Sequence, residues 1–514
     1  MIGRWCRDRY GPLVLSPMSV IAWLSMGCLP FHRVEHTIAA ERPNIILMMA
    51  DDLGWGDVGF NGGTTILTPH LDAMARHSLR FTRFYAAAPV CSPTRGSCLT
   101  GRHPYRYGIY FANIGHMKPE EWTLAELLQQ AGYTTGHFGK WHLGTMTTTL
   151  RDANRGGRAG NEQHYSPPQA HGFEVCFSTE SKVPTFDPMW KPKHSRNGDA
   201  WNAIEDWHQV EPYGTFYWDE RGARVTDPLR GDDSKLIMDR ALTFIRSAVD
   251  NRQPFFAVVW FHAPHLPVVA DSAHRNLYPD APSLRHQNYY ACITALDEQV
   301  GRLRAQLRAL GIAEETLITF CSDNGPEGSA RDPGSAGPFR GRKRSLYEGG
   351  IRVPALIEWP GHVLAGQSTD FPAVTSDYLP TLVDILQLRF PDDRPLDGIS
   401  LRPVLHGERP TRQAAIGFQS RDQVAWSTAR YKLLRQGNGP WELYDLYEDP
   451  AESNNLAAAH PQLVERLRQE LQQWVQSCQQ SDAGADYGVV GRPQAGVGIG
   501  WPVDDGPLPV DQPR

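Results

Sequence analysis

The segment "CSPTRGSCLTG", residues 91–101, places a cysteine two residues before a proline and four before an arginine. A buried, unreactive thiol is the commonest role of a free cysteine, whereas a thiolate nucleophile would need a histidine base. A disulfide between Cys91 and Cys98 is excluded if residues 94–101 form a helix, because seven residues of helix span about 10 Å and a disulfide needs Cα atoms within about 7 Å. The role of Cys91 therefore depends on the polar side chains that accompany it.

Polar side chains also stand at the ends of four strand-like stretches elsewhere in the chain. They are Asp51 and Asp52 after 45–50, Lys140 and His142 at the end of 133–142, His262 and His265 after 254–261, and Asp323 and Asn324 after 316–322. Ligands of open α/β sheets bind beyond the carboxyl ends of the strands, so we expect these side chains to converge. Capping of a helix or turn is the alternative role for an aspartate or asparagine in these places.

The elements that must position these residues follow from the hydrophobic pattern. The apolar runs are too short for helices and are typical of strands buried on both faces. Helical patterns separate them, such as "EWTLAELLQQAG" at 121–132 and "YYACITALDEQVGRLRAQLRALG" at 289–311, each ended by a glycine. This alternation predicts an α/β fold in which helices sandwich a large, mostly parallel sheet.

The chain divides into four predicted segments. Residues 1–40 combine early arginines with a short apolar stretch and indicate an export signal, with cleavage near Ala40 and a periplasmic or secreted product. An uncleaved membrane anchor is the alternative, disfavoured because Pro17 interrupts the stretch and a stable span needs more apolar residues. Residues 41–390 form the catalytic domain, 391–481 a smaller C-terminal α+β subdomain, and 482–514 a Gly/Pro-rich tail.

Composition excludes several other classes of function. The net charge is -6 and mixed in sign, so neither a nucleic acid nor an anionic membrane is expected as a partner. The six cysteines beyond the signal are widely and irregularly spaced, which does not indicate a disulfide framework. The chain has no CxxC pair, so a structural zinc site is not expected.

The pattern around Cys91 resembles the signature of the type I sulfatases, members of the alkaline phosphatase superfamily. Cys91, Pro93 and Arg95 match its C-x-P-x-R core, and "LTG" follows at 99–101. Further motifs stand in the order of that family: "ADDLG" (50–54), "GKWHLG" (139–144), "HAPHLP" (262–267), "SDNG" (322–325) and "KRSLYEGGIRVP" (343–354). The resemblance extends over roughly residues 43–480.

This resemblance implies hydrolysis of sulfate esters, with a sulfated saccharide as the expected substrate. It implies that a formylglycine-generating or equivalent maturation enzyme oxidises Cys91 to formylglycine, whose hydrated form supplies the nucleophilic oxygen. A hard divalent cation can hold that oxygen and a sulfate oxygen, and carboxylate and amide ligands suit calcium. One Ca²⁺ is therefore expected, held by Asp51, Asp52, Cys91, Asp323 and Asn324.

The same resemblance assigns roles to the basic residues. Arg95 lies one helical turn from Cys91 and is expected to bond the formylglycine hydroxyl or the metal ligands. Lys140 lies in the same motif as His142, and the family's histidine there removes a proton from the second diol oxygen so that sulfate leaves. His265 and Lys343 match positions that bind sulfate and protonate the leaving alcohol. His262 is expected in a supporting layer.

Two other functions remain open from the sequence. A formylglycine-dependent phosphodiester or phosphonate monoester hydrolase can share both the modification and the fold. A catalytically silent glycan-binding protein would have lost motif residues, and none is missing here. An alkaline phosphatase proper is disfavoured, because it would carry serine or threonine at position 91 and ligands for two zinc ions.

Substrate specificity is predicted in the segment 145–235, where regular periodicity fades. Its aromatic residues are expected to pack against a sugar ring or, alternatively, to anchor the segment to the core: Trp190, Trp201, Trp207, Tyr213, Tyr217 and Trp218. The basic run "RGRKR" at 340–344 is either a solvated loop or a subsite for a second anionic group on the substrate.

Overall fold

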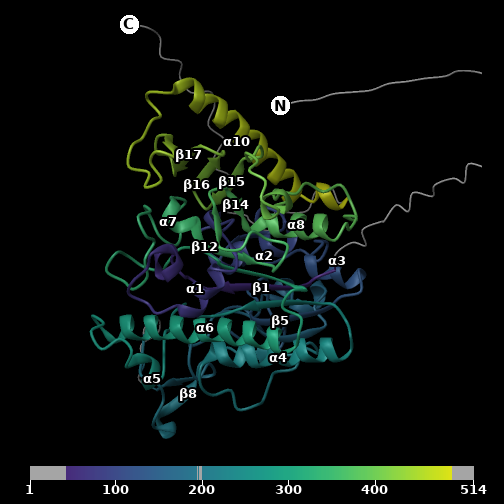
Figure 1. Ribbon diagram of the computed structural model, residues 1–514, viewed down its shortest axis with the longest axis vertical. Helices are drawn as coiled ribbons and strands as arrows, with labels where there is room; N and C mark the ends of the chain where they lie inside the picture. The colour runs from purple at the N-terminus through teal and green to yellow at the C-terminus, as the bar shows by residue number, and fades with distance from the viewer. Residues whose placement is uncertain (1–41, 194, 196–199, 489–514) are drawn as a thin grey trace, which may run out of the picture. The chain divides into compact units, whose positions relative to one another are not determined.

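The computed structural model describes residues 42–193, 195 and 200–488 (Figure 1). The predicted export signal at 1–40 lies outside the described residues, as does the predicted tail beyond residue 488. Within the described ranges, no helix combines the length and the apolar character that crossing a membrane would take.

A ten-stranded sheet forms the centre of the fold. Its strands run in the order β13 (Gln367–Thr369), β2 (Leu79–Tyr85), β12 (Arg352–Glu358), β11 (Thr316–Ser322), β1 (Asn44–Ala50), β10 (Phe255–Trp260), β5 (Thr134–Lys140), β6 (Val175–Thr179) and β9 (Tyr217–Trp218), with β14 (Ala373–Val374) paired to β2. The five central strands β11, β1, β10, β5 and β6 are mutually parallel, whereas β12 and β9 pair antiparallel with their neighbours. The predicted mostly parallel sheet is confirmed.

Alternate residues of the central strands enter two separate cores, which explains why these strands are apolar throughout. Ile45, Leu47 and Met49 of β1 pack into one core, and Ile46 and Met48 pack into the other. The first core is completed by helices α2 (Cys91–Thr100), α3 (Leu124–Gln130) and α8 (Tyr378–Ile385). The second is completed by α1 (Pro69–Ala75), α4 (Asp233–Asp250) and α6 (Leu284–Ala309), of which α4 and α6 run along one face of the sheet (Figure 1).

The C-terminal part contains a small antiparallel sheet covered by one helix. The sheet has the order β15 (Ile416–Ser420), β16 (Gln423–Ser427), β17 (Tyr431–Gln436) and β18 (Glu442–Asp445). Helix α10 (Pro461–Asp482) buries Leu467 and Leu471 against this sheet, with Leu463 and Trp474 partly buried beside them. The predicted amphipathic helix and its apolar face are confirmed.

The segment between β5 and α4 is more regular than its sequence indicated. It contains β6 and β9, which extend the main sheet, and the hairpin of β7 (Trp190–Pro192) and β8 (Val210–Pro212). The remaining short elements are β3 (Ile109–Phe111), β4 (Ile114–Gly115), α5 (Ser272–Arg275), α7 (Glu348–Ile351) and α9 (Arg402–Leu405). Strand β6 escaped prediction because its five residues, "VCFST", are too few to establish a period.

Candidate active site at the carboxyl ends of the strands

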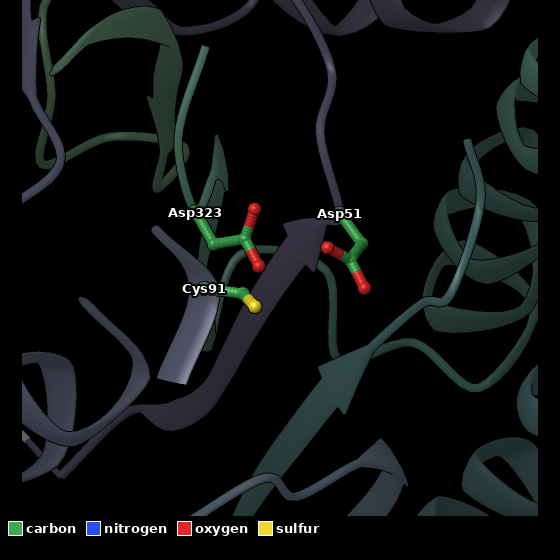
Figure 2. A group of neighbouring side chains, drawn as sticks. All are labelled: Asp51, Cys91 and Asp323. Atoms are coloured by element: carbon green, nitrogen blue, oxygen red, sulfur yellow. The ribbon is translucent and has the colours of Figure 1, made fainter. Parts of the chain in front are cut away.

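The acidic residues meet where two neighbouring parallel strands end. Asp51 follows β1 directly, and Asp323 follows β11, whose residue Ser322 lies opposite Ala50. Figure 2 shows the carboxylates of Asp51 and Asp323 and the sulfur of Cys91 directed toward a common space. One ligating atom from each of these three residues lies within 4.8 Å of the others. The predicted convergence of these three residues is therefore present in the structure.

Cys91 is the first residue of helix α2, and the helix carries Arg95 one turn further along. The Arg95 guanidinium is completely buried. Its Nε and Nη2 donate to one oxygen of Asp323 at 3.1 and 2.6 Å, and its Nη1 donates to the carbonyl of Lys140 at 3.1 Å. Arg95 thus ties helix α2 to the ends of β11 and β5.

Two lysines neutralise the first pair of aspartates. The Nζ of Lys140 lies 2.5 Å from Oδ2 of Asp51, and the Nζ of Lys343 lies 2.6 Å from Oδ1 of Asp52. Asn324 donates through Nδ2 to the same oxygen of Asp52 at 2.7 Å. All of these side chains are buried. Negative and positive side chains therefore alternate across the site. Because they are buried, each charge is stabilised by the opposite charge beside it.

The donor set fits a hard cation. Oδ1 of Asp51 and Oδ1 of Asn324 are buried acceptors that make no hydrogen bond within the described part of the chain. Burial raises the pKa of Asp52 above its ordinary value and raises that of Asp323 to about 7, and the nearby charge of Asp51 adds to both shifts. Crowded carboxylates with spare oxygens are the ligands that a divalent cation stabilises.

His142 contacts the sulfur of Cys91. Its Nδ1 lies 3.4 Å from Sγ, and its Nε2 lies 3.0 Å from Oδ1 of Asn113. Burial, reinforced by the charge of Lys140, lowers the pKa of His142 well below its ordinary value, so the ring is neutral. Because Nε2 donates its hydrogen to the Asn113 oxygen, the lone pair of Nδ1 is directed at the side chain of residue 91.

Two unusual backbone conformations aim this histidine. His142 has φ 59°, and Gly139, the last residue but one of strand β5, has φ 105°. A Cβ at Gly139 would lie 1.9 Å from the carbonyl oxygen of Trp260, so only glycine fits beside β10 at this point. The chain therefore turns after β5, and Lys140 and His142 both reach the cluster.

His265 and Lys343 border the same cluster from a third side. The His265 Nδ1 donates to its neighbour's carbonyl at 2.6 Å, and Nε2 lies 3.7 Å from Oδ2 of Asp52. Burial lowers the pKa of His265 well below its ordinary value, against the opposing charge of Asp51. Lys343 also pairs with Glu327 at 3.2 Å. The His265 side chain retains 14% exposure, so the site opens to solvent on this side.

His262 lies behind the site. Its Nδ1 lies 2.8 Å from Asp233 and its Nε2 lies 2.7 Å from the hydroxyl of Thr179, and the ring is completely buried. Thr179 is the last residue of β6 and lies opposite Lys140 of β5. His262 therefore links α4 to the strand beside Lys140, which agrees with the supporting role expected from the sequence.

The environment of Cys91 disfavours loss of the thiol proton, so the side chain is a poor source of a thiolate nucleophile. Burial raises its pKa above the ordinary value, and the charges of Lys140 and Lys343 only partly oppose this effect. An unmodified nucleophilic cysteine would instead have a lowered pKa. The six cysteines of the described ranges are all free, so the expectation that Cys91 and Cys98 form no disulfide is confirmed.

The aromatic residues predicted to face a sugar divide into two groups. Tyr217 and Trp218 are 0% and 2% exposed, stacking on Phe177 and donating to Asp152 respectively, so the prediction that they shape the pocket is wrong. They occupy β9 at the sheet edge, an element that the sequence did not reveal. Trp190 and Trp207 pack against each other beside the β7–β8 hairpin. Trp201 and Tyr213 line a cavity described below.

The basic run at 340–344 is largely satisfied within the protein. Arg342 donates to the backbone carbonyls of Glu327, Pro333 and Gly334. Arg344 forms a two-pronged ion pair with the Glu327 carboxylate. These contacts favour a structural role for both arginines over a subsite for an anionic group.

Comparison with known proteins identifies the family. The family model described as Sulfatase matches residues 43–388. The chain belongs to the sulfatase family. A second model, described as N-sulphoglucosamine sulphohydrolase, C-terminal, matches residues 337–480 and covers the small sheet and α10.

Relatives of this sulfatase act on different sulfate esters. N-acetylgalactosamine-6-sulfatase of Mus musculus is 32% identical over 435 residues, which are 82% of this chain and 77% of the relative. Steryl-sulfatase of Mus musculus is 32% identical over 480 residues, with coverage of 82% and 74%. The crystal structure of Ps i-CgsB in complex with k-i-k-neocarrahexaose superimposes with a TM-score of 0.72 at 27% identity, covering 86% of this chain and 94% of that one. The protein is thus a sulfuric ester hydrolase.

Three residues around the site escaped sequence analysis: Asn113, Lys182 and Glu327. Asn113 lies in the tight turn between β3 and β4 with φ 62°, a conformation that asparagine tolerates better than most residues. Its sequence signal was only that of a turn. Glu327 closely follows the "SDNG" motif, and its two basic partners were visible in the run at 340–344, but no local pattern connects the two segments.

Proposed function

We propose that this sulfatase hydrolyses sulfate esters of a saccharide by means of a formylglycine at position 91. The observation that carries the proposal is the position of the Cys91 side chain. It lies at the N-terminus of α2, beside the carboxylates of Asp51 and Asp323 and in contact with Nδ1 of His142. The hydrated aldehyde would supply an oxygen nucleophile that the buried thiol does not.

The residues proposed to hold one Ca²⁺ are Asp51, Asp52, Asp323 and Asn324, together with the modified side chain of residue 91. When bound, the ion would draw electron density from a sulfate oxygen and stabilise the charge that develops in the reaction. The carboxylates and the unpartnered oxygens of Asp51 and Asn324 support this set.

The basic residues would then divide the proton transfers. His142, held by Asn113, is placed to take a proton from a hydroxyl at position 91 through Nδ1. Lys140 and Lys343 would bind sulfate oxygens, because their ammonium groups line the cluster. His265 retains solvent exposure where the leaving alcohol must depart, and Lys343 lies beside it. Both are the proposed proton donors, His265 once the negative charge of bound sulfate favours its protonated form. Arg95 would hold the helix and Asp323 in place.

The proposed substrate is a sulfated carbohydrate rather than another sulfate ester. N-acetylgalactosamine-6-sulfatase and the oligosaccharide-bound Ps i-CgsB structure support a saccharide, whereas steryl-sulfatase is a relative of equal identity with a different substrate. The proposal includes export directed by the segment 1–40. It also includes a formylglycine-generating enzyme as a partner, because the oxidation of Cys91 requires a second protein.

Parallel assays test the type of reaction. The enzyme should release sulfate from sulfated mono- or disaccharides with a kcat/KM at least about 100-fold above its kcat/KM for phosphate diesters and phosphonate monoesters of matched alcohols. A phosphonate monoester hydrolase of Agrobacterium radiobacter shares the fold, with a TM-score of 0.58 at 22% identity. A preference for the phosphorus esters would therefore replace the proposed function with that alternative.

Asn113 is a positioning residue in this mechanism, and its removal has a distinctive expected result. Asn113→Ala should lower kcat about 10- to 100-fold with little change in KM, because the His142 ring loses the acceptor that fixes its tautomer. The acid limb of the pH–kcat profile should move at the same time. Asn113→Asp, which keeps the acceptor oxygen, should recover most of the rate. An unchanged pH profile in Asn113→Ala, or equal losses in both variants, would show that the residue acts only on the fold.

A further inference from the structure

A lysine that the sequence motifs do not include lies at the rim of the active site. Lys182 follows β6 by three residues, and β6 ends beside β5 at Thr179, opposite Lys140. The segment after Lys182 is fastened to the loop after His265, because the Thr185 hydroxyl donates to the carbonyl of Val269 at 2.7 Å. Lys182 therefore leaves the sheet at the same edge as the catalytic residues.

The charge of Lys182 is not taken up by a neighbouring acid. Lys140 pairs with Asp51, and Lys343 pairs with Asp52 and Glu327. Lys182 makes no salt bridge or hydrogen bond with any residue that the structure describes. Burial lowers its pKa, and the positive charges of Lys140 and Lys343 add to that effect. A half-buried ammonium without a partner is costly for a protein unless a ligand supplies the opposite charge.

Lys182 also lines a cavity of about 260 Å³. The walls include Trp201 and Tyr213, which offer ring surfaces, and Lys191, whose charge is paired with Glu211 at 3.0 Å. Trp201 is 8% exposed, and its buried indole N–H has no hydrogen-bond partner among the described residues. Pockets for drug-sized ligands begin at roughly 300 Å³, so this cavity suits a single sugar ring.

The cavity wall is anchored to the active-site loop. The Nδ2 of Asn288 on α6 donates to the carbonyl of Trp201 at 2.8 Å and to that of Val268 at 3.1 Å. Val268 follows His265 by three residues, so one buried amide fixes Trp201 relative to the catalytic histidine. The cavity therefore keeps a fixed position relative to the proposed sulfate-binding site.

We propose that this cavity is a subsite for a sugar that carries a second anionic group, a sulfate or a carboxylate, which Lys182 binds while Tyr213 and Trp201 contact the ring. The proposal rests on the proposed saccharide sulfatase activity and adds its substrate class: saccharides with two negative groups, of which one is the sulfate that is hydrolysed. In this proposal Lys182, and not the basic run at 340–344, binds the second anionic group of the substrate. Aromatic faces and a partly desolvated cation are the usual means of recognising an anionic sugar.

Paired substrates test the subsite. The kcat/KM for sulfate release is measured with a sugar monosulfate, the matching disulfate and the matching monosulfated uronic acid. The wild-type enzyme should prefer at least one of the dianionic sugars by about tenfold or more. Lys182→Ala should reduce kcat/KM for the preferred dianion about 10- to 100-fold and leave the monosulfate within about threefold. Which dianion is affected distinguishes a second sulfate from a carboxylate.

Three companion variants make the result interpretable. Lys182→Arg should recover most of the preference because it keeps the charge, and Lys182→Met should not, although it keeps the apolar stem. Lys193→Ala is the matched control, since Lys193 lies near the same hairpin but donates to the carbonyl of His208 and does not line the cavity. It should leave both rates unchanged. Thermal unfolding should confirm that every variant is folded.

Several outcomes would overturn the proposal. An equal loss on monosulfate and dianion would assign Lys182 to the scissile sulfate itself. An unchanged rate on every substrate would exclude a role in binding. Both results require active wild-type enzyme and leave the saccharide sulfatase function intact. Wild-type enzyme that desulfates a non-carbohydrate ester but none of the sugars would instead refute the proposed function, and the subsite with it.

Discussion

Replacing Cys91 with alanine should abolish sulfate release, with a loss of roughly 10⁴-fold or more in kcat. The side chain of residue 91 lies where His142 Nδ1 and the carboxylates of Asp51 and Asp323 converge, whereas the neighbouring hydroxyl of Ser92 donates to the backbone carbonyl of His142. The fold should persist, because the Cys91 sulfur has no hydrogen-bonding neighbour besides His142 among the described residues. Sulfate release and thermal unfolding, measured on the same preparation, check both parts.

Cys98 provides the matched control for this experiment. It lies on the same helix, is buried to the same degree and packs in the core between α2 and the sheet. Cys98→Ala should therefore lower stability by about 1 to 2 kcal/mol without a comparable loss of kcat. Mass spectrometry of the tryptic peptide ending at Arg95 should find formylglycine at position 91 of the active wild-type enzyme. A fully active sample that contains only unmodified cysteine would disprove the proposed nucleophile.

The strands that position this site could be predicted, because buried parallel strands appear in the sequence as short, continuous apolar runs. The apolar runs of β1, β10 and β11 each stop where the polar residues begin, so Asp51, His265 and Asp323 could be assigned to one edge of the sheet. Arg95 could be placed by helical spacing from Cys91. In each case a short stretch of sequence indicates both the type of element and the place of the functional residue on it.

The parts that escaped prediction depend on contacts between distant segments. Nothing near Asn113 shows that its amide oxygen will lie 3.0 Å from a histidine that follows it by 29 residues. Strands β6 and β9 are short, and they are strands only because the edge of the sheet is available to them. Tyr217 and Trp218 were misjudged for this reason. The aromatic residues of β9 are buried at the edge of the sheet. In a sequence without visible periodicity, such residues cannot be distinguished from aromatic residues that bind a ligand.

Replacing Asp51 with asparagine should prevent binding of the proposed calcium ion and lower kcat by at least about 10³-fold. The substitution keeps the size of the side chain but removes the charge that balances a cation and Lys140. Asp51→Asn leaves the buried Lys140 ammonium without its carboxylate partner, which should cost about 3 to 5 kcal/mol of stability, so thermal unfolding is measured alongside activity. Elemental analysis of the purified protein measures the metal, and sulfate release measures the consequence.

A nearby buried carboxylate separates the metal effect from the effect of losing any buried charge. Asp57 accepts hydrogen bonds from the backbone of Gly54 and Ser335 and from the Tyr289 hydroxyl, and burial raises its pKa to about 6. Asp57→Asn should therefore lower stability but retain one calcium per chain. Removing calcium from the wild-type enzyme with a chelator should reproduce the Asp51→Asn loss. Added Ca²⁺ should restore activity to the wild type but not to Asp51→Asn, because the variant lacks one of the negatively charged ligands. Undiminished calcium in Asp51→Asn, or full activity of the metal-free wild type, would contradict the proposed site.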